Sequence, residues 1–316
     1  MSAYILRRLL LIIPTLFVAS LIIFAIIRLI PGDIIDQMAS ERIYFSEMDR
    51  ADLEHHLGLD VPIYVQYGRW MAGVFRGDFG ESLWKRTPVT ADIAERLPVT
   101  IELGLLAIVI GLIIALPIGV YSAIRQDTVG DYIGRSFAIA AIAVPGFWIG
   151  TMVMVFPSLW WGWSPPVKLI PFTRDPAGNL GMFIIPAVIM GMALSGVTMR
   201  MTRTMMLEVL RQDYIRTAWS KGLRERVVVI RHALKNALIP VVTIMGLQIP
   251  ILVGGSVIME QIFVLPGIGR LMLEAIFERD YPIVSGVMLV IATFVLLVNL
   301  LVDVSYSFLD PRVKLR

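Results

Sequence analysis

Long apolar runs separated by short polar segments follow one another along the whole chain. Each run is continuously apolar over roughly twenty residues, the length that an α-helix needs to cross the hydrocarbon core of a bilayer. None shows the period-two alternation of a transmembrane β-strand. The pattern therefore predicts an all-α, polytopic membrane protein with six transmembrane helices. The six runs are 9–30, 103–124, 137–156, 182–197 with its continuation, 238–259, and 283–301 with its continuation.

The first run separates a short N-terminal end from a long polar segment. It is too long for the core of a signal peptide, so we expect an uncleaved helix, with a cleaved signal as the alternative. We predict three parts: 1–31 for the N-terminal cytoplasmic end and first helix, 32–98 for an extracytoplasmic cap segment, and 99–316 for the core domain with five helices and a cytoplasmic loop at 204–237. Within the cap, Ser46 is a candidate N-cap for a short helix that Gly58 would end.

Two regions of the core depart from simple helices. The outer segment 158–181 begins with three tryptophans and contains four prolines, which predicts an irregular loop at the membrane interface. The fifth run contains Pro240 and Pro250, and the backbone they break would line either a translocation pathway or a close helix contact. The sequence leaves these alternatives equal. Polar positions in this run are tentative pathway residues: Thr243, Gln248 and Ser256.

The distribution of charged residues between the apolar runs predicts how the chain is oriented in the membrane. The segment between the fourth and fifth runs carries nine arginines and lysines against three acidic residues, whereas 260–282 is mainly acidic. Positive residues stay on the cytoplasmic side, so the first segment is placed inside and the second outside. With Arg7 and Arg8 also inside, an even number of helices puts both termini in the cytoplasm.

Composition supports a membrane protein and excludes several chemistries. The chain is 57% hydrophobic and 17% charged, with a mean hydropathy of +0.77. It has no cysteine, so thiolate catalysis and thiolate metal sites are excluded. No lysine follows a glycine, which excludes a phosphate-binding loop of the G-x-x-x-x-G-K-[ST] type, and the three histidines lack metalloprotease spacing. We therefore expect no catalytic residues, metal or cofactor in this chain.

The segment 206–242 is the one long basic, amphipathic stretch. Apolar side chains at i, i+1, i+4, i+5, i+8 and i+9 predict one face of a short helix. Asp213 would favour the positive end of the helix dipole, and Gly222 would supply a left-handed stop. An interfacial helix on anionic lipid is an equal alternative to a partner-binding helix. The face comprises Tyr214, Ile215, Ala218, Trp219, Gly222 and Leu223.

Short motifs along nearly the whole chain resemble those of a known family. Arg216-Thr217-Ala218 followed by Gly222, and then 232–240, resembles the E-A-A-x-x-x-G loop of ABC importer permease subunits, and the sequence is most similar to the dipeptide, oligopeptide and nickel branch. The glutamate and first alanine of the general loop are Arg216 and Thr217 here. The other matching motifs are Tyr4-Ile5-Leu6-Arg7-Arg8, Pro31-Gly32-Asp33, Gly58-Leu59-Asp60, Gly77-Asp78-Phe79-Gly80, Arg200-Met201-Thr202-Arg203, Asp213-Tyr214-Ile215, Pro266-Gly267-Ile268-Gly269 and Asp280-Tyr281-Pro282.

The resemblance implies a type I ABC importer permease fold in the inner membrane, and half of a pathway for di- or oligopeptides. Its partners would be a homologous second permease, two ATP-binding subunits that hold ATP and Mg, and an extracytoplasmic solute-binding protein. Related systems carry nickel, glutathione or oligosaccharides, and a secondary carrier or channel is the alternative of a different class. The implied coupling residues are Asp213, Tyr214, Arg216, Thr217, Ala218, Lys221, Gly222 and Leu223.

Overall fold

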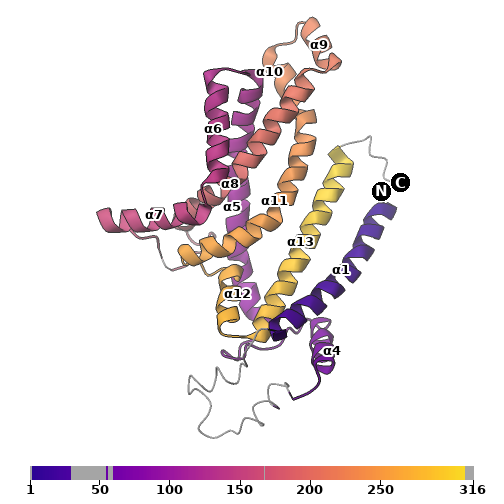
Figure 1. Ribbon diagram of the computed structural model, residues 1–316, viewed down its shortest axis with the longest axis vertical. Coiled ribbons are helices and arrows are strands. Elements are labelled where there is room, and N and C mark those ends of the chain that lie inside the picture. The colour runs from indigo at the N-terminus through magenta and orange to yellow at the C-terminus, as the bar shows by residue number, and fades with distance from the viewer. Residues whose placement is uncertain (1, 30–54, 56–59, 167, 310–316) are drawn as a thin grey trace. The chain divides into compact units, whose positions relative to one another are not determined.

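The computed structural model of the protein describes residues 2–29, 55, 60–166 and 168–309. Every regular element in these ranges is helical, apart from one isolated bridge between Glu81 and Pro88, which confirms the all-α prediction (Figure 1). The short helix predicted after Ser46 lies outside the described residues, except at position 55. In chain order the elements are α1 (Ser2–Leu29), α4 (Ile63–Val74), α5 (Val89–Ile124), α6 (Val129–Ala143), α7 (Gly146–Trp161), α8 (Pro176–Leu210), α9 (Asp213–Ser220), α10 (Glu225–Val227), the π-helix η1 (Val228–Leu234), α11 (Lys235–Ile262), α12 (Ile268–Phe277) and α13 (Tyr281–Leu309).

The third predicted membrane helix is broken. In the described residues, five helices are long and apolar enough to cross a bilayer, and α6 with α7 makes a sixth only if this bent pair counts as one span. The pair bends by 86°. Pro145 explains the break, because proline disfavours helical geometry at the preceding residue, and Val144 is extended at φ −84° and ψ 122°. The single helix predicted over 137–156 is therefore two helices joined at a sharp bend, which together make one candidate span.

The irregular outer loop is shorter than the predicted 158–181. At its start α7 continues until Gly162, whose φ of 62° ends the helix in a left-handed conformation. At its other end Asp175 caps α8 by accepting a hydrogen bond from the backbone N–H of Gly178, and Pro176 occupies the first helical turn. Proline is favourable there because that N–H has no intrahelical partner in any case.

The backbone of the fifth run is continuous, contrary to the predicted break. α11 runs through both Pro240 and Pro250 without interruption. The irregularity lies just before it instead, where η1 is wound as a π-helix over seven residues. Inserted π-turns of this kind are often found at functional sites.

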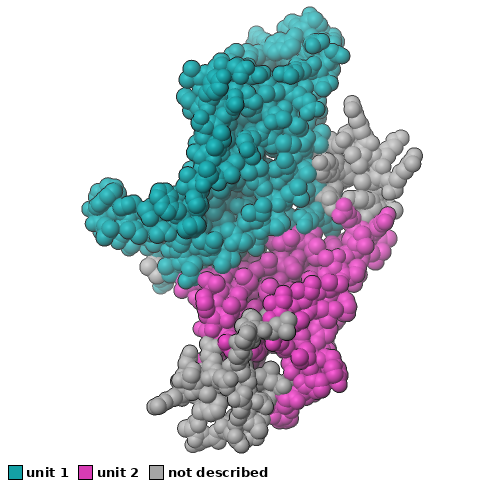
Figure 2. All heavy atoms as spheres, in the orientation of Figure 1, with its two compact units in different colours: residues 1–4, 100–265, 298–316 teal, residues 5–99, 266–297 magenta. Residues whose placement is uncertain are grey.

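The chain divides into two compact units (Figure 2). Unit 1 comprises 1–4, 100–265 and 298–316, and unit 2 comprises 5–99 and 266–297. In sequence, three boundaries fall inside α1, α5 and α13, and the fourth falls between α11 and α12. The division into parts at 31 and 98 remains a prediction.

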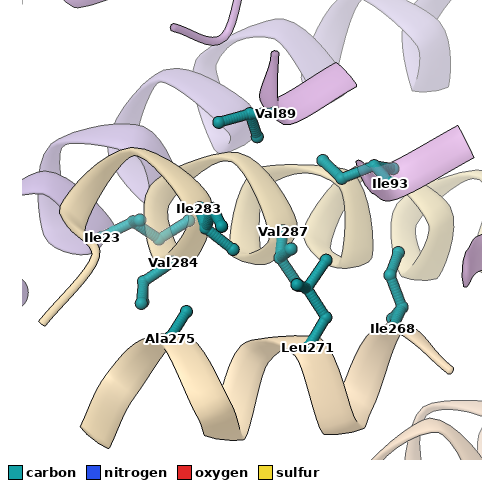
Figure 3. Packing of buried hydrophobic residues seen from close by; sticks show 9 residues of the cluster. All are labelled: Ile23, Val89, Ile93, Ile268, Leu271, Ala275, Ile283, Val284 and Val287. Atoms are coloured by element: carbon teal, nitrogen blue, oxygen red, sulfur yellow. The ribbon is translucent and has the colours of Figure 1, made fainter. Parts of the chain in front are cut away.

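Unit 2 is built on an aliphatic core. Side chains from α1, α5, α12 and α13 meet there, and Figure 3 shows Leu271 of α12 beside Val287 of α13. Removing such aliphatic side chains from water is the main stabilising contribution to folding. The buried cluster comprises Ile23, Val89, Ile93, Ile268, Leu271, Ala275, Ile283, Val284 and Val287.

A buried carboxylate organises the polar end of unit 2. Asp280, which is fully buried, accepts hydrogen bonds from the Ser82 hydroxyl at 2.5 Å and from the backbone N–H of Leu83 at 3.1 Å. The indole of Trp84 donates to the carbonyl of Glu278 at 2.7 Å. Burial raises the pKa of the Asp280 carboxyl, although these hydrogen bonds oppose the shift. The network joins the segment after α4 to the turn before α13.

Unit 1 is built around α8, which packs against α6, α7 and α11. Glycine permits the close approach: a Cβ on Gly196 would lie 2.7 Å from the carbonyl oxygen of Ala138 in α6. Nearby, Arg203 of α8 makes a bidentate ion pair with Asp131 of α6, with N···O distances of 2.8 and 2.7 Å. The Asp131 side chain is fully buried, so this pair ties the two helices together away from water.

Candidate functional site

The basic segment between α8 and α11 forms a short helix on a hydrophobic base. Ile215 and Ala218, on one side of α9, are buried in a cluster to which α5, α8, η1 and α11 also contribute. Ile215 is completely removed from solvent. We call this cluster the α9 base. Its buried members are Ala123, Met206, Ile215, Ala218, Val228, Val229, Ala233 and Ala237.

The end of α9 is a Schellman motif. The N–H of Gly222 donates to the carbonyl of Trp219 at 2.9 Å, and the N–H of Leu223 donates to that of Ala218 at 3.4 Å. This pattern requires a left-handed residue between them, and Gly222 has φ +74°. The left-handed stop predicted at this glycine is confirmed.

Three large side chains of the same segment stay exposed. Tyr214, Trp219 and Leu223 retain 45%, 44% and 37% of their surface in water. The hydroxyl of Tyr214 is held in place by the amide of Asn236, which donates a hydrogen bond of 2.8 Å. Exposed aromatic side chains on a fixed frame are typical anchors of protein–protein interfaces.

Polar side chains surround these three. The carboxylate of Asp213 and the guanidinium of Arg216 lie 3.4 Å apart, and both are largely exposed. Such a pair contributes little to stability in water. Thr217 donates to the carbonyl of Asp213 at 3.0 Å, and Lys221 is exposed beside Gly222. All eight sequence-predicted residues thus lie on one element and its C-terminal turn.

The structure divides the apolar face that the sequence presents as single. Helical spacing correctly groups the positions, but Ile215 and Ala218 turn into the chain while Tyr214 and Trp219 remain outside. A period of 3.6 identifies apolar positions without saying which of them a helix buries in its own chain. Which positions are buried depends on how η1 and α8 pack against α9, and the spacing of apolar residues within α9 does not show that packing.

The tentative pathway residues are not brought together. Gln248 lines a cavity of about 360 Å³ with apolar side chains of α6, α7, α8 and α11, and its amide donates to the hydroxyl of Thr198 at 3.3 Å. The hydroxyls of Thr243 and Ser256 instead bond to carbonyls of their own helix, at Ile239 and Val253. Neither of the two lines this cavity.

Some residues of this region were not identified from sequence. Glu225 pairs with Arg125 at 3.7 Å, which links α10 to the segment after α5. Asp131, the buried partner of Arg203, had no distinguishing signal because it stands before the apolar run that was used to locate the third helix. Glu260, near the end of α11, is buried and accepts from the Thr100 hydroxyl at 2.6 Å. No group of three or more potential metal ligands exists among the described residues.

Comparison with known proteins agrees with this arrangement. Residues 115–315 match the family described as binding-protein-dependent transport system inner membrane component, and residues 1–104 match its N-terminal family. The dipeptide transport system permease protein DppB of Escherichia coli (strain K12) is 40% identical over an alignment 337 positions long, which covers 99% of both chains. The oligopeptide transport system permease protein AppB of Bacillus subtilis (strain 168) is 40% identical over 319 residues, covering 99% of this chain and 100% of that one.

A solved structure shares the fold. The structure of an amino acid ABC transporter with histidines superposes with a TM-score of 0.50 at 14% sequence identity, and covers 71% of this chain and 95% of that chain. The likeness agrees with a type I permease architecture for the helices. By its family and its apolar helices, the protein is a multi-pass membrane protein and not an enzyme. The chain belongs to the family of binding-protein-dependent transport system inner membrane components, the permease subunits of ABC transporters.

Proposed function

We propose that this permease imports di- or oligopeptides and that α9 is its coupling helix, the element that an ATP-binding subunit holds. The single observation that carries the proposal is the division of α9 into two sides. Ile215 and Ala218 fix the helix to its own chain, while Tyr214 and Trp219 remain nearly half exposed among the described residues. A helix fixed in this way can transmit a push from a bound subunit to α8 and α11.

Peptide cargo rests on the relatives. Full-length proteins named as dipeptide and oligopeptide permeases are 40% identical to this chain, so the same branch is favoured over nickel, glutathione or oligosaccharide uptake. The cavity beside Gln248 has one amide among apolar side chains. An amide that can donate and accept suits a peptide backbone, whereas a metal ion would need several carboxylate or imidazole ligands.

The partners are inferred from the same reasoning. ATP and Mg would bind two separate ATP-binding subunits, a second homologous permease would complete the pathway, and an extracytoplasmic binding protein would deliver the peptide. The basic α8–α11 segment favours a cytoplasmic α9, and with it cytoplasmic N- and C-termini. A secondary carrier would need ionisable coupling groups at mid-span. The buried pair of Asp131 with Arg203 lies near the start of α6 and the end of α8, and its two hydrogen bonds join these helices.

The test is ATP-dependent uptake of a labelled dipeptide into vesicles containing this chain and its co-expressed partners. Truncating Trp219 to alanine removes a large exposed anchor, and we expect co-purification of the ATP-binding subunits to weaken about thirtyfold, from a loss of about 2 kcal/mol. Trp161→Ala is the matched control, because Trp161 is 74% exposed on α7.

Three results would contradict parts of the proposal. Uptake that proceeds without ATP-binding subunits would refute the importer mechanism. Equal loss of the ATP-binding subunits in the Trp219 and Trp161 variants would refute α9 as the coupling helix. Vesicles that take up nickel or an oligosaccharide but no peptide would refute the cargo alone.

A further inference from the structure

Unit 2 contains an apolar cavity of about 720 Å³ that the transport function does not use. It lies between α1, α4 and α13, and Phe17, Met71 and Phe294 are among its lining residues. We call it the α1–α13 cavity. Its volume falls in the range of small-molecule binding sites.

The side chains that line the cavity provide few hydrogen-bonding groups for water. Its two hydroxyl groups are already bonded: Ser20 bonds to the hydroxyl of Tyr67 at 2.9 Å, and Thr293 donates to the carbonyl of Leu289 at 2.8 Å. Cavities lined by aliphatic and aromatic side chains stay dry or take up apolar ligands. A polar occupant such as a peptide backbone would lose its hydrogen bonds to water without replacement.

The two long walls of the cavity belong to membrane helices. The apolar windows of α1 and α13 have mean hydropathies of 2.9 and 2.6, so both lie at the depth of the lipid chains. An apolar space at that depth is therefore continuous with the hydrocarbon of the bilayer. Lipid chains and the apolar helices of a second permease both reach that depth, and the positive charge at the rim of the cavity favours a lipid.

One end of the cavity is closed by α4, which is fixed to α1. The ring of Tyr67 packs edge-on against Phe17 and Phe24, at centroid distances of 6.5 and 5.3 Å, and Arg28 donates to the side chain of Gln66 at 3.0 Å. These contacts hold α4 across the C-terminal half of α1. The space beside it is therefore a fixed feature of the fold.

The rim at α4 is apolar and positively charged. Phe75 lines the cavity yet keeps 84% of its surface exposed, and Arg76 follows it directly. Arg76 is exposed, whereas Arg69 lies on the side of α4 that faces away from the lining residues Met71 and Val74. Arg76 makes no ion pair within the part of the chain that the structure describes. Cationic groups beside an apolar pocket complement a phosphate attached to an acyl chain.

We propose that the α1–α13 cavity binds one acyl chain of an anionic phospholipid, whose phosphate lies at Arg76. The lipid fills the space between α1 and α13 beside α4 and supports the contact of these three helices. This site is independent of the coupling surface at α9. It also differs from the lipid that surrounds any membrane protein, because the chain enters a space enclosed by three elements.

A photo-crosslinking experiment identifies the occupant. The full transporter, with Phe75→p-benzoylphenylalanine, is placed in bilayers of phosphatidylglycerol and phosphatidylcholine, irradiated, and analysed by mass spectrometry. We expect a phospholipid adduct at this position. Tyr64 is the matched control, since it is 76% exposed at the other end of α4 and does not line the cavity, and it should give a much smaller lipid adduct.

Retention of lipid during purification tests separately the apolar cavity and the charged rim beside it. Val290→Trp fills the cavity and should abolish retained lipid, whereas Ile22→Trp, at a 52% exposed position of α1 outside the lining, should not. Replacing Arg76 by glutamine should lower the preference for phosphatidylglycerol about fivefold, whereas Arg69→Gln, on the other side of α4, should leave it unchanged.

Three outcomes would overturn the proposal. Position 75 cross-linked to a polypeptide would show that another subunit fills the cavity. Equal lipid adducts at 75 and 64 would show only the surrounding bilayer. Lipid retained equally by the Val290→Trp and Ile22→Trp proteins would place the lipid elsewhere.

Discussion

Replacement of Gly222 by valine tests how the end of α9 is made. Gly222 has φ +74°, and its N–H and that of Leu223 close the Schellman motif at the end of the helix. A Cβ built on Gly222 meets no atom within 4 Å. The substitution therefore creates no clash with neighbouring residues, and its whole effect comes from the backbone conformation.

The free-energy cost of Gly222→Val is set by the left-handed backbone conformation at this position. An L-residue in the left-handed region costs roughly 1–2 kcal/mol, and a β-branched residue lies at the upper end. A cost of this size changes the population of the native turn by about fivefold to thirtyfold. Loss of the turn would release Leu223 and the C-terminal end of α9, while Ile215 remains held in the α9 base.

The assay is ATP-dependent peptide uptake, measured together with the amount of ATP-binding subunit that co-purifies. We expect both to fall for Gly222→Val and to stay near the original level for Gly222→Asn, since asparagine tolerates positive φ. Normal uptake by the valine variant would refute the reasoning. Equal damage by valine and asparagine would show that the glycine is needed for space against a partner and not for its conformation.

Further predictions concern stability, measured by thermal unfolding of the purified protein. Arg203→Met should destabilise unit 1 by about 3–5 kcal/mol because it leaves the buried Asp131 carboxylate unpaired, and the double variant Arg203→Met with Asp131→Leu should be more stable than the single one. Gly246→Leu should cost about 1–3 kcal/mol because its Cβ would collide with Val302, and Val302→Ala should recover part of that loss. Burial raises the pKa of Asp280, so the folded protein binds this proton more tightly than the unfolded chain does, and stability should fall as the pH rises from about 3.9 to the raised value. Asp280→Asn should remove that slope, and an unchanged slope would contradict the assignment.

Hydropathy predicted most of the helical architecture because length and apolarity are enough to identify a membrane helix. It failed at Pro145, where the run 137–156 remains apolar although the backbone turns by 86°. The same proline does mark the break, through its effect on Val144, once local geometry is considered together with hydropathy. Pro240 and Pro250 show the limit of that argument, because α11 continues through both.

The candidate site was predictable in position but not in orientation. Helical spacing and Gly222 located α9 and its end, since both depend on neighbours in sequence. The burial of Ile215 depends on a cluster that includes Met206 of α8 and Val228 of η1, and the spacing of residues within α9 does not show how those two elements fold back on it. The ion pair of Asp131 with Arg203 is likewise invisible without the packing of α6 on α8.

The two sides of α9 are subject to separate requirements. A substitution at Ile215 or Ala218 must preserve packing against four other elements of the same chain. A substitution at Tyr214 or Trp219 leaves that packing intact, because both side chains lie on the exposed side of α9. If α9 is the coupling helix, as we propose, exchanging the residues of its outer side for those of a related permease should redirect the choice of ATP-binding subunit. Such a chimera would keep its own transmembrane fold and bind the ATP-binding subunits of the other transporter.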